Sequence, residues 1–183
     1  MNFRSHFATL CALVIAVGAG AAHAEKADKD KPTHIEANRM SSDDTRRMSI
    51  FEGNVVLTKG TLTVHANRIV VREDLEGFQI ATATGNPATF RQKTDPKGDQ
   101  PAVWIDGEAK RIVLDDKDEK VELFDNARVT RDKDEVRGNY IFVDERSDFY
   151  SVTGGTGAQP GRVRAVLQPK NPPATTKPAP GKR

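Results

Sequence analysis

Two segments of this 183-residue chain repeat one another in sequence. Positions 36–85 align with positions 108–157 without a gap, at a constant offset of 72, and 14 of the 50 aligned pairs are identical. Composition alone would give roughly three identities. The match predicts an internal duplication, in which two copies of one unit bury their apolar faces against each other.

Within each copy, apolar and polar residues alternate, which is the pattern of a half-buried β-strand. The first copy shows it from Phe51 to Val64, with a turn expected at Lys59-Gly60, and the second shows it from Val121 to Val143. No segment has a sustained 3.6-residue apolar period. The sequence therefore predicts a helix-poor, all-β antiparallel domain over residues 33–168. A sandwich, a jelly roll and a solenoid open at its ends all fit this pattern.

Residues 1–24 read as a cleaved signal peptide. Arg4 precedes an apolar run from Ala8 to Ala22, and Ala22-His23-Ala24 is a small-x-small cleavage pattern. A retained membrane anchor is the alternative, but the run is shorter than the roughly 20 residues that cross a bilayer. We expect an exported protein that begins at Glu25, with a flexible segment over 25–32.

The only cysteine, Cys11, lies inside the predicted signal peptide. It follows Leu10, whereas a lipoprotein cleavage site requires a small residue there, so no lipid anchor is expected. The mature chain would contain no cysteine, which excludes disulfides and thiolate metal ligands. We expect its stability to come from packing and strand pairing.

The last residues, 169–183, are rich in proline and lysine and contain no acid and no large apolar residue. Such a segment buries too little to offset its ordering entropy, so a disordered tail is expected. Without Arg4, the mature chain has 27 basic and 26 acidic residues. This balance, with no basic patch interleaved with aromatics, argues against a nucleic-acid partner.

Candidate catalytic and metal-binding residues are few. His34 and His65 occupy unrelated positions of the repeat, and the acidic run 115–119 lacks the glycine and final glutamate of a helix-flanked calcium loop. The glycine cluster at 154–157 is not followed by the lysine of a phosphate-binding loop. The sequence predicts no catalytic residue, metal or cofactor, and therefore a binding or structural role.

Several segments together resemble the OstA-like family of lipopolysaccharide export proteins. They run in order over nearly the whole expected domain: Pro32–Glu36, Phe51–Gly60, Ala66–Val71, Gly85–Phe90, Asn126-Ala127, Gly138–Ile141 and Arg162–Leu167. One departure stands out, because the glycine of the Gly53-Asn54 pair is replaced by Asp125 in the second copy.

The resemblance implies an elongated, twisted antiparallel β-jelly roll, open at both ends, that carries lipopolysaccharide through the periplasm by shielding the lipid A acyl chains. It also implies head-to-tail self-association into a bridge between the two membranes. The implied partners are an LptC-like inner-membrane component of an ATP-driven extractor and the N-terminal domain of an LptD-like outer-membrane protein.

Strand alternation supplies the residues expected to face inward and contact lipid. By resemblance, positions 33, 35, 90 and 114 are the first choices. The full set is Thr33, Ile35, Phe51, Val55, Leu57, Leu62, Val64, Phe90, Ile112, Leu114, Leu123 and Val136. The same residues would form an ordinary closed core if the chain carried no lipid.

The ends of an open roll leave unpaired strand edges that a partner strand can cover. The residues expected at this interface are Thr33, Ile35, Ala37, Val163, Val166 and Leu167. The alternative function is a periplasmic β-sandwich adaptor with a closed core, which binds envelope proteins through these same edges.

Overall fold

A computed structural model describes residue 28 and residues 31–77, 79–96, 101–147, 149–155 and 161–169. The predicted signal peptide and almost all of the predicted tail lie outside the described residues, as does most of the segment 25–32. In the part of the chain that is described, no helix has the length and apolar character needed to cross a membrane.

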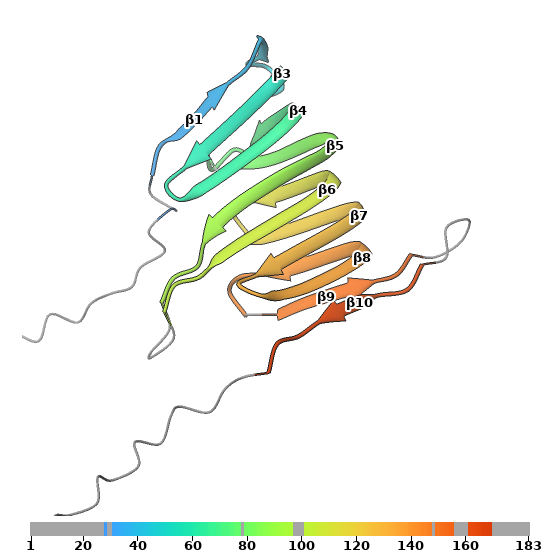
Figure 1. Ribbon diagram of the computed structural model, residues 1–183. Coiled ribbons are helices and arrows are strands. Elements are labelled where there is room, and N and C mark those ends of the chain that lie inside the picture. Colours follow the sequence, from blue (N-terminus) through green and yellow to red (C-terminus); the bar gives the residue numbers. More distant parts are fainter. Residues whose placement is uncertain are drawn as a thin grey trace, which may run out of the picture.

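The described residues form one antiparallel sheet of ten strands and no helix. The strands stack in the order β1-β3-β4-β5-β6-β7-β8-β10, with β2 beside β3 and β9 beside β8 (Figure 1). Their bounds are β1 Thr33–Glu36, β2 Arg39–Asp43, β3 Met48–Lys59, β4 Leu62–Glu73, β5 Gln79–Lys93, β6 Trp104–Asp115, β7 Lys120–Arg131, β8 Asp134–Asp144, β9 Phe149–Thr153 and β10 Arg164–Val166.

The register shifts near the middle of every pairing between the long strands β3 to β8, for example between Glu52 and Val55 where β3 pairs with β4. Extra residues of this kind bend a strand. The sheet therefore folds into two facing layers, and in Figure 1 the fainter strand halves lie behind the nearer ones.

We call these layers 1 and 2. Layer 1 contains β2, β9, the first halves of β3, β5 and β7, and the second halves of β4, β6 and β8. Layer 2 contains β1, β10 and the other halves. No pairing among the described strands joins β1 or β2 to β9 or β10. The predicted fold, an elongated antiparallel jelly roll open at both ends, is confirmed.

The duplication is visible strand by strand. Adding 72 to the bounds of β3 gives those of β7, and the bulge between Glu52 and Val55 recurs between Phe124 and Ala127. At the position where the second copy lacks glycine, Asp125 has a φ of 64°, against 81° for Gly53. The aspartate therefore preserves the bulge despite its side chain.

The gap-free sequence alignment differs from the structure at its end. In the first copy, Thr84 pairs with Arg68. The alignment makes Tyr140 the counterpart of Arg68 and Thr156 the counterpart of Thr84. In the structure, however, the residue opposite Tyr140 is Thr153. The β8–β9 turn is shorter than the β4–β5 turn, so residues of β9 come earlier in the chain than the alignment places them. Residues of β10 come later than the alignment places them. Phe90 lies opposite Val64, and the residue opposite Val136, the counterpart of Val64, is Ala165, which is more than 72 positions after Phe90.

We expect replacement of Asp125 by glycine to stabilise the fold. A positive φ strains a residue with a side chain, and relief of this strain outweighs the greater entropy of glycine in the unfolded chain, for a net gain of about 0.5–1 kcal/mol. Urea unfolding of the variant measures the gain. Lys110→Gly, in β6 and without a positive φ, provides the control and is expected to destabilise. Equal losses in both variants would contradict the assignment of strain to Asp125.

Candidate functional site: the interior of the roll and its edges

The space between the two layers is lined by apolar side chains, and no polar or charged residue is buried among those described. The alternation predicted from sequence brings its inward set together here. Val55, Leu57, Val64, Phe90, Ile112 and Leu123 are buried in one core; Ile35, Phe51, Leu62, Leu114 and Val136 pack against it half-buried; Thr33 is half-buried at the start of β1.

The inward set predicted from the sequence omits several core residues. Ile69 and Ile141 are among the largest fully buried side chains and form an identical pair of the repeat, which is the signal that could have identified them. The bulges explain the omission: in β4 the inward positions are even before the bulge and odd after it. The other omitted core residues are Ala81, Ala83, Ala88, Ala109, Val121 and Ala127.

A glycine makes room for a large side chain inside the roll. Gly107 lies opposite Phe90 on the neighbouring strand, and a Cβ added at Gly107 would be 2.1 Å from Cε1 of the Phe90 ring. The phenylalanine therefore occupies space that a glycine leaves open, and only 5% of it is exposed. The interior of the roll is packed with side chains around this ring.

The side of the roll opposite the bulges, where the strand tips of the two layers face each other, is referred to below as the mouth. Lys59 ends β3 in layer 2, and Asp116 begins the turn after β6 in layer 1. The Lys59 Nζ lies 2.9 Å from Oδ1 and 3.1 Å from Oδ2 of Asp116. The Lys59 side chain is 15% exposed, so this ion pair is partly shielded from solvent and ties the two layers together across the mouth.

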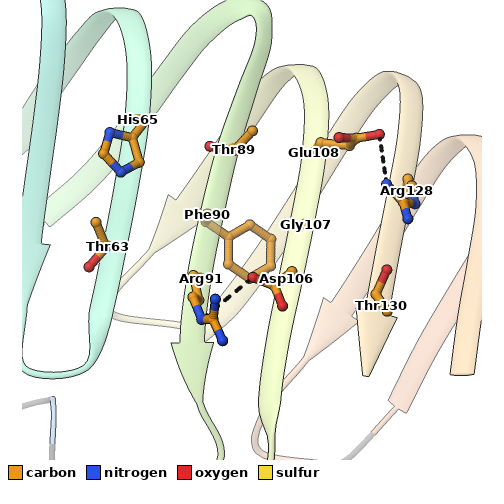
Figure 2. Close-up of a pocket in the computed structure, with 10 residues that line it drawn as sticks. All are labelled: Thr63, His65, Thr89, Phe90, Arg91, Asp106, Gly107, Glu108, Arg128 and Thr130. Carbon is orange, nitrogen blue, oxygen red and sulfur yellow. Dashed lines mark hydrogen bonds and ion pairs between the residues drawn. The ribbon is translucent and has the colours of Figure 1, made fainter. Parts of the chain in front are cut away.

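A depression of about 430 Å³ lies on the outside of the sheet, over β4 to β7 (Figure 2). Its charged side chains are largely paired. Arg91 lies 3.7 Å from Asp106, and Arg128 lies 3.5 Å from Glu108. His65 and three threonines also line it. Because the charges compensate one another, the depression does not present a concentrated field of one sign.

The acidic run 115–119 does not gather around a metal position. Lys120 donates a hydrogen bond to Asp118, which lowers the pKa of that carboxyl group, and Lys117 binds Glu76 and Asp74. Among the described residues, no group of three or more histidines, cysteines, aspartates or glutamates is placed to hold a metal ion.

The Tyr140 hydroxyl has the clearest pKa shift. Burial, then its 2.6 Å hydrogen bond to Glu122, raises its pKa from 10.0 to about 12. The folded state holds this proton more tightly than the unfolded state, so its contribution to stability is complete below pH 10 and falls between pH 10 and 12. We expect Tyr140→Phe to flatten this part of the stability profile, measured by urea unfolding at a series of pH values. An unchanged slope would exclude Tyr140 as its source.

The two ends of the sheet expose apolar side chains. Val163, Val166 and Leu167 are exposed at and around β10, as the sequence suggested for an edge, and Leu167 is 67% exposed. At the other end Ala37 is exposed, and Thr33 and Ile35 are half-buried. The sequence did not identify β2 and β9 as edges, yet Met40, Phe149 and Tyr150 on these strands are also exposed.

The fold and the site define an all-β roll with an apolar interior and an exposed strand edge at each end. The chain matches the family described as LptA/(LptD N-terminal domain) LPS transport protein over residues 34–149, and it belongs to this family. The resemblance to the OstA-like export proteins is thereby confirmed.

Individual relatives agree with this assignment. The lipopolysaccharide export system protein LptH of Pseudomonas aeruginosa is 26% identical over 175 residues, which cover 93% of this chain and 98% of the relative. LptA of Escherichia coli K12 is 29% identical over 153 residues, which cover 81% of this chain and 77% of LptA. The crystal structure of LptH, described as the periplasmic component of a lipopolysaccharide transport device, matches with a TM-score of 0.69 and 25% identity over 78% of this chain and 99% of LptH.

Proposed function

We propose that this chain is an exported periplasmic carrier of lipopolysaccharide, which holds the acyl chains of lipid A between its two layers. The observation that carries the proposal is the continuous apolar interior, which extends from β1 to β9 in a sheet that stays open at both ends. Each acyl CH₂ left in water costs about 0.8 kcal/mol, so a lipid with several chains needs such a covering to cross an aqueous compartment.

The interior is suited to a sliding ligand. Apolar contacts are non-directional, and with no buried polar group among the described residues there is no strong site at which a headgroup would stop. Because side chains already fill the space between the layers, lipid enters by separating the strand tips at the mouth. The half-buried residues Leu62 and Leu114 lie at or next to strand tips on the mouth side, so they are the first that an entering acyl chain would contact.

The two ends of the roll serve as docking edges. An exposed strand edge offers unpaired backbone groups to another strand, so β1 and β10 can extend the sheet into a neighbour. A contact between unlike ends does not close on itself and generates a chain of molecules. We propose head-to-tail self-association, with an LptC-like inner-membrane component at one terminus of the bridge and an LptD-like N-terminal domain at the other.

A dye-displacement assay tests the carrier function. We expect the protein spanning positions 25–183 to bind a fluorescent apolar dye and to release it when lipopolysaccharide is added. Deacylated lipopolysaccharide, which retains the sugars and phosphates, serves as the control and is expected to leave the dye in place. Absence of dye binding would favour a closed adaptor module, and equal displacement by the deacylated control would place recognition on the sugars and contradict the proposal.

A further inference from the structure

The repeat makes one end of the molecule the structural counterpart of a strand inside it. When 72 is added to each residue number, the pairings of β1 and β2 with β3 become those of β6 with β7. Ile35 lies opposite Leu57, and their counterparts Gly107 and Val129 lie opposite each other. In the same way, Arg39 lies opposite Glu52, and Arg111 lies opposite Phe124. Likewise, β9 and β10 pair with β8 as β5 pairs with β4.

Inside the molecule β5 is covered by β6. At the C-terminal end of the described sheet, β9 and β10 lack the strand that β6 supplies to β5, and at the N-terminal end β1 and β2 reproduce that strand. The β5–β6 junction therefore describes how the C-terminal end of one molecule fits the N-terminal end of a second copy. Met40 illustrates the fit: it is 58% exposed, whereas its counterpart Ile112 is fully buried against the neighbouring half.

The ion pair across the mouth is part of the same internal junction, because Lys59 belongs to the first copy of the repeat and Asp116 to the second. Their counterparts are Arg131, which is the equivalent of Lys59, and Asp44, which is the equivalent of Asp116. The charges are of the same sign at each position. Both counterparts are exposed, and neither has an ion-pair partner among the described residues.

The backbone presents the counterparts in the same way. Gly60 and Asp132, which follow the two basic residues, have φ values of 59° and 54°. Arg47 and Glu119, which end the two acidic turns, have φ values of 46° and 53°.

Hydrogen bonds within the acidic turns also correspond. The Asp43 Oδ1 accepts a bond from the Arg46 amide, as the Asp115 Oδ1 does from the Asp118 amide. Arg131 and Asp44 therefore lie on turns of matching conformation at opposite ends of the molecule.

We propose that Arg131 of one molecule pairs with Asp44 of the next, as Lys59 pairs with Asp116 within the chain, and that this pair fixes the register of the head-to-tail contact. The inference rests on the proposed self-association and adds the residues that determine its alignment. In this register Ala165 lies opposite Ile35 of the second copy, and Val166 lies opposite His34, as Phe90 and Arg91 lie opposite Gly107 and Asp106.

Charge reversal tests the pair. We expect Arg131→Glu and Asp44→Arg each to weaken association of the protein spanning positions 25–183 by about tenfold or more, because each creates a like-charge contact. An equimolar mixture of the two variants is expected to recover wild-type association, since unlike molecules restore opposite charges at every junction. Lys110→Glu, an exposed reversal away from both ends, is the control. Sedimentation velocity over a concentration series measures all five samples.

Cysteine cross-linking tests the register, and the mature chain contributes no cysteine of its own. Under mild oxidation, Val166→Cys is expected to form a disulfide with His34→Cys on a second molecule in preference to Glu36→Cys, which lies further along the same strand. Preference for position 36 would overturn the proposed register.

The remaining outcomes separate this inference from the proposed function. Wild-type association that neither reversal weakens would overturn the Arg131–Asp44 pair and leave head-to-tail association standing. Loss of association in both variants without recovery in the mixture would also overturn the pair. A wild-type protein that stays monomeric at every concentration would overturn self-association itself, and the pair with it.

Discussion

Replacing Ile112 with alanine is expected to lower the free energy of unfolding by about 2–5 kcal/mol, the range for removing a large aliphatic side chain from a packed core. Ile112 is fully buried and belongs to the interior core between the layers. Ala83 lies opposite Ile112 and is also fully buried. Because its side chain is short, it cannot extend into the cavity that the substitution leaves. Urea unfolding followed by circular dichroism measures the loss.

The adjacent residue provides the matched control. Val113 points to the other face of β6 and is half-buried. Val113→Ala is expected to cost clearly less than Ile112→Ala. Equal losses at the two positions would show that the interior of the isolated protein is loosely packed, contrary to the structure.

Replacing Leu114 with aspartate is expected to weaken lipopolysaccharide binding by about tenfold or more, because an acyl chain at this position would have to contact an unpaired charge. Leu114 is half-buried near the layer 1 side of the mouth and packs against the core. The charge stays close to solvent in the lipid-free protein, so the variant is expected to fold. Titration of fluorescent lipopolysaccharide gives the affinity.

Val113→Asp is the control for this experiment, since it places the same charge one residue away on the outer face. We expect near wild-type binding from this variant. Comparable losses in both variants would indicate that lipid binds outside the roll or that the charge acts through folding, and circular dichroism of the two variants distinguishes these explanations.

The strand architecture was accessible from sequence because side chains alternate along a strand and because the repeat supplied a second reading of each segment. The equivalence of β3 and β7 follows directly from the constant offset between the two copies. All eleven apolar residues expected inside reach the core or pack against it. Whether these residues contact lipid is the functional prediction that the experiments above address.

What the sequence did not reveal depends on the bulges and on packing between the layers. A bulge reverses which residues face inward, so a two-residue period continued across the bulge does not assign Ile69 and Ile141 to the interior. Alanines such as Ala83 and Ala109 carry no strong apolar signal, yet they are buried in the core. The Lys59–Asp116 pair joins residues far apart in the sequence, and only the folded layers bring them together.

The edges show a similar limit. The sequence identified the segments 33–39 and 162–168 as candidate edges because they hold the first and last strands expected in the domain. It did not show that β2 and β9 share those ends, since the turns before β9 and β10 differ in length from their counterparts in the first copy and break the constant offset. These shifts became visible only from the pairing of β8 with its two neighbours.

Photo-crosslinking in cells tests whether lipid A travels between the two layers. A photoreactive phenylalanine analogue replaces Phe90, whose ring lies inside the roll over Gly107, or the adjacent outward residue Thr89. We expect lipopolysaccharide to be captured at position 90 and not at position 89. Capture at position 89 alone would contradict transport between the layers and place the lipid on the outer face.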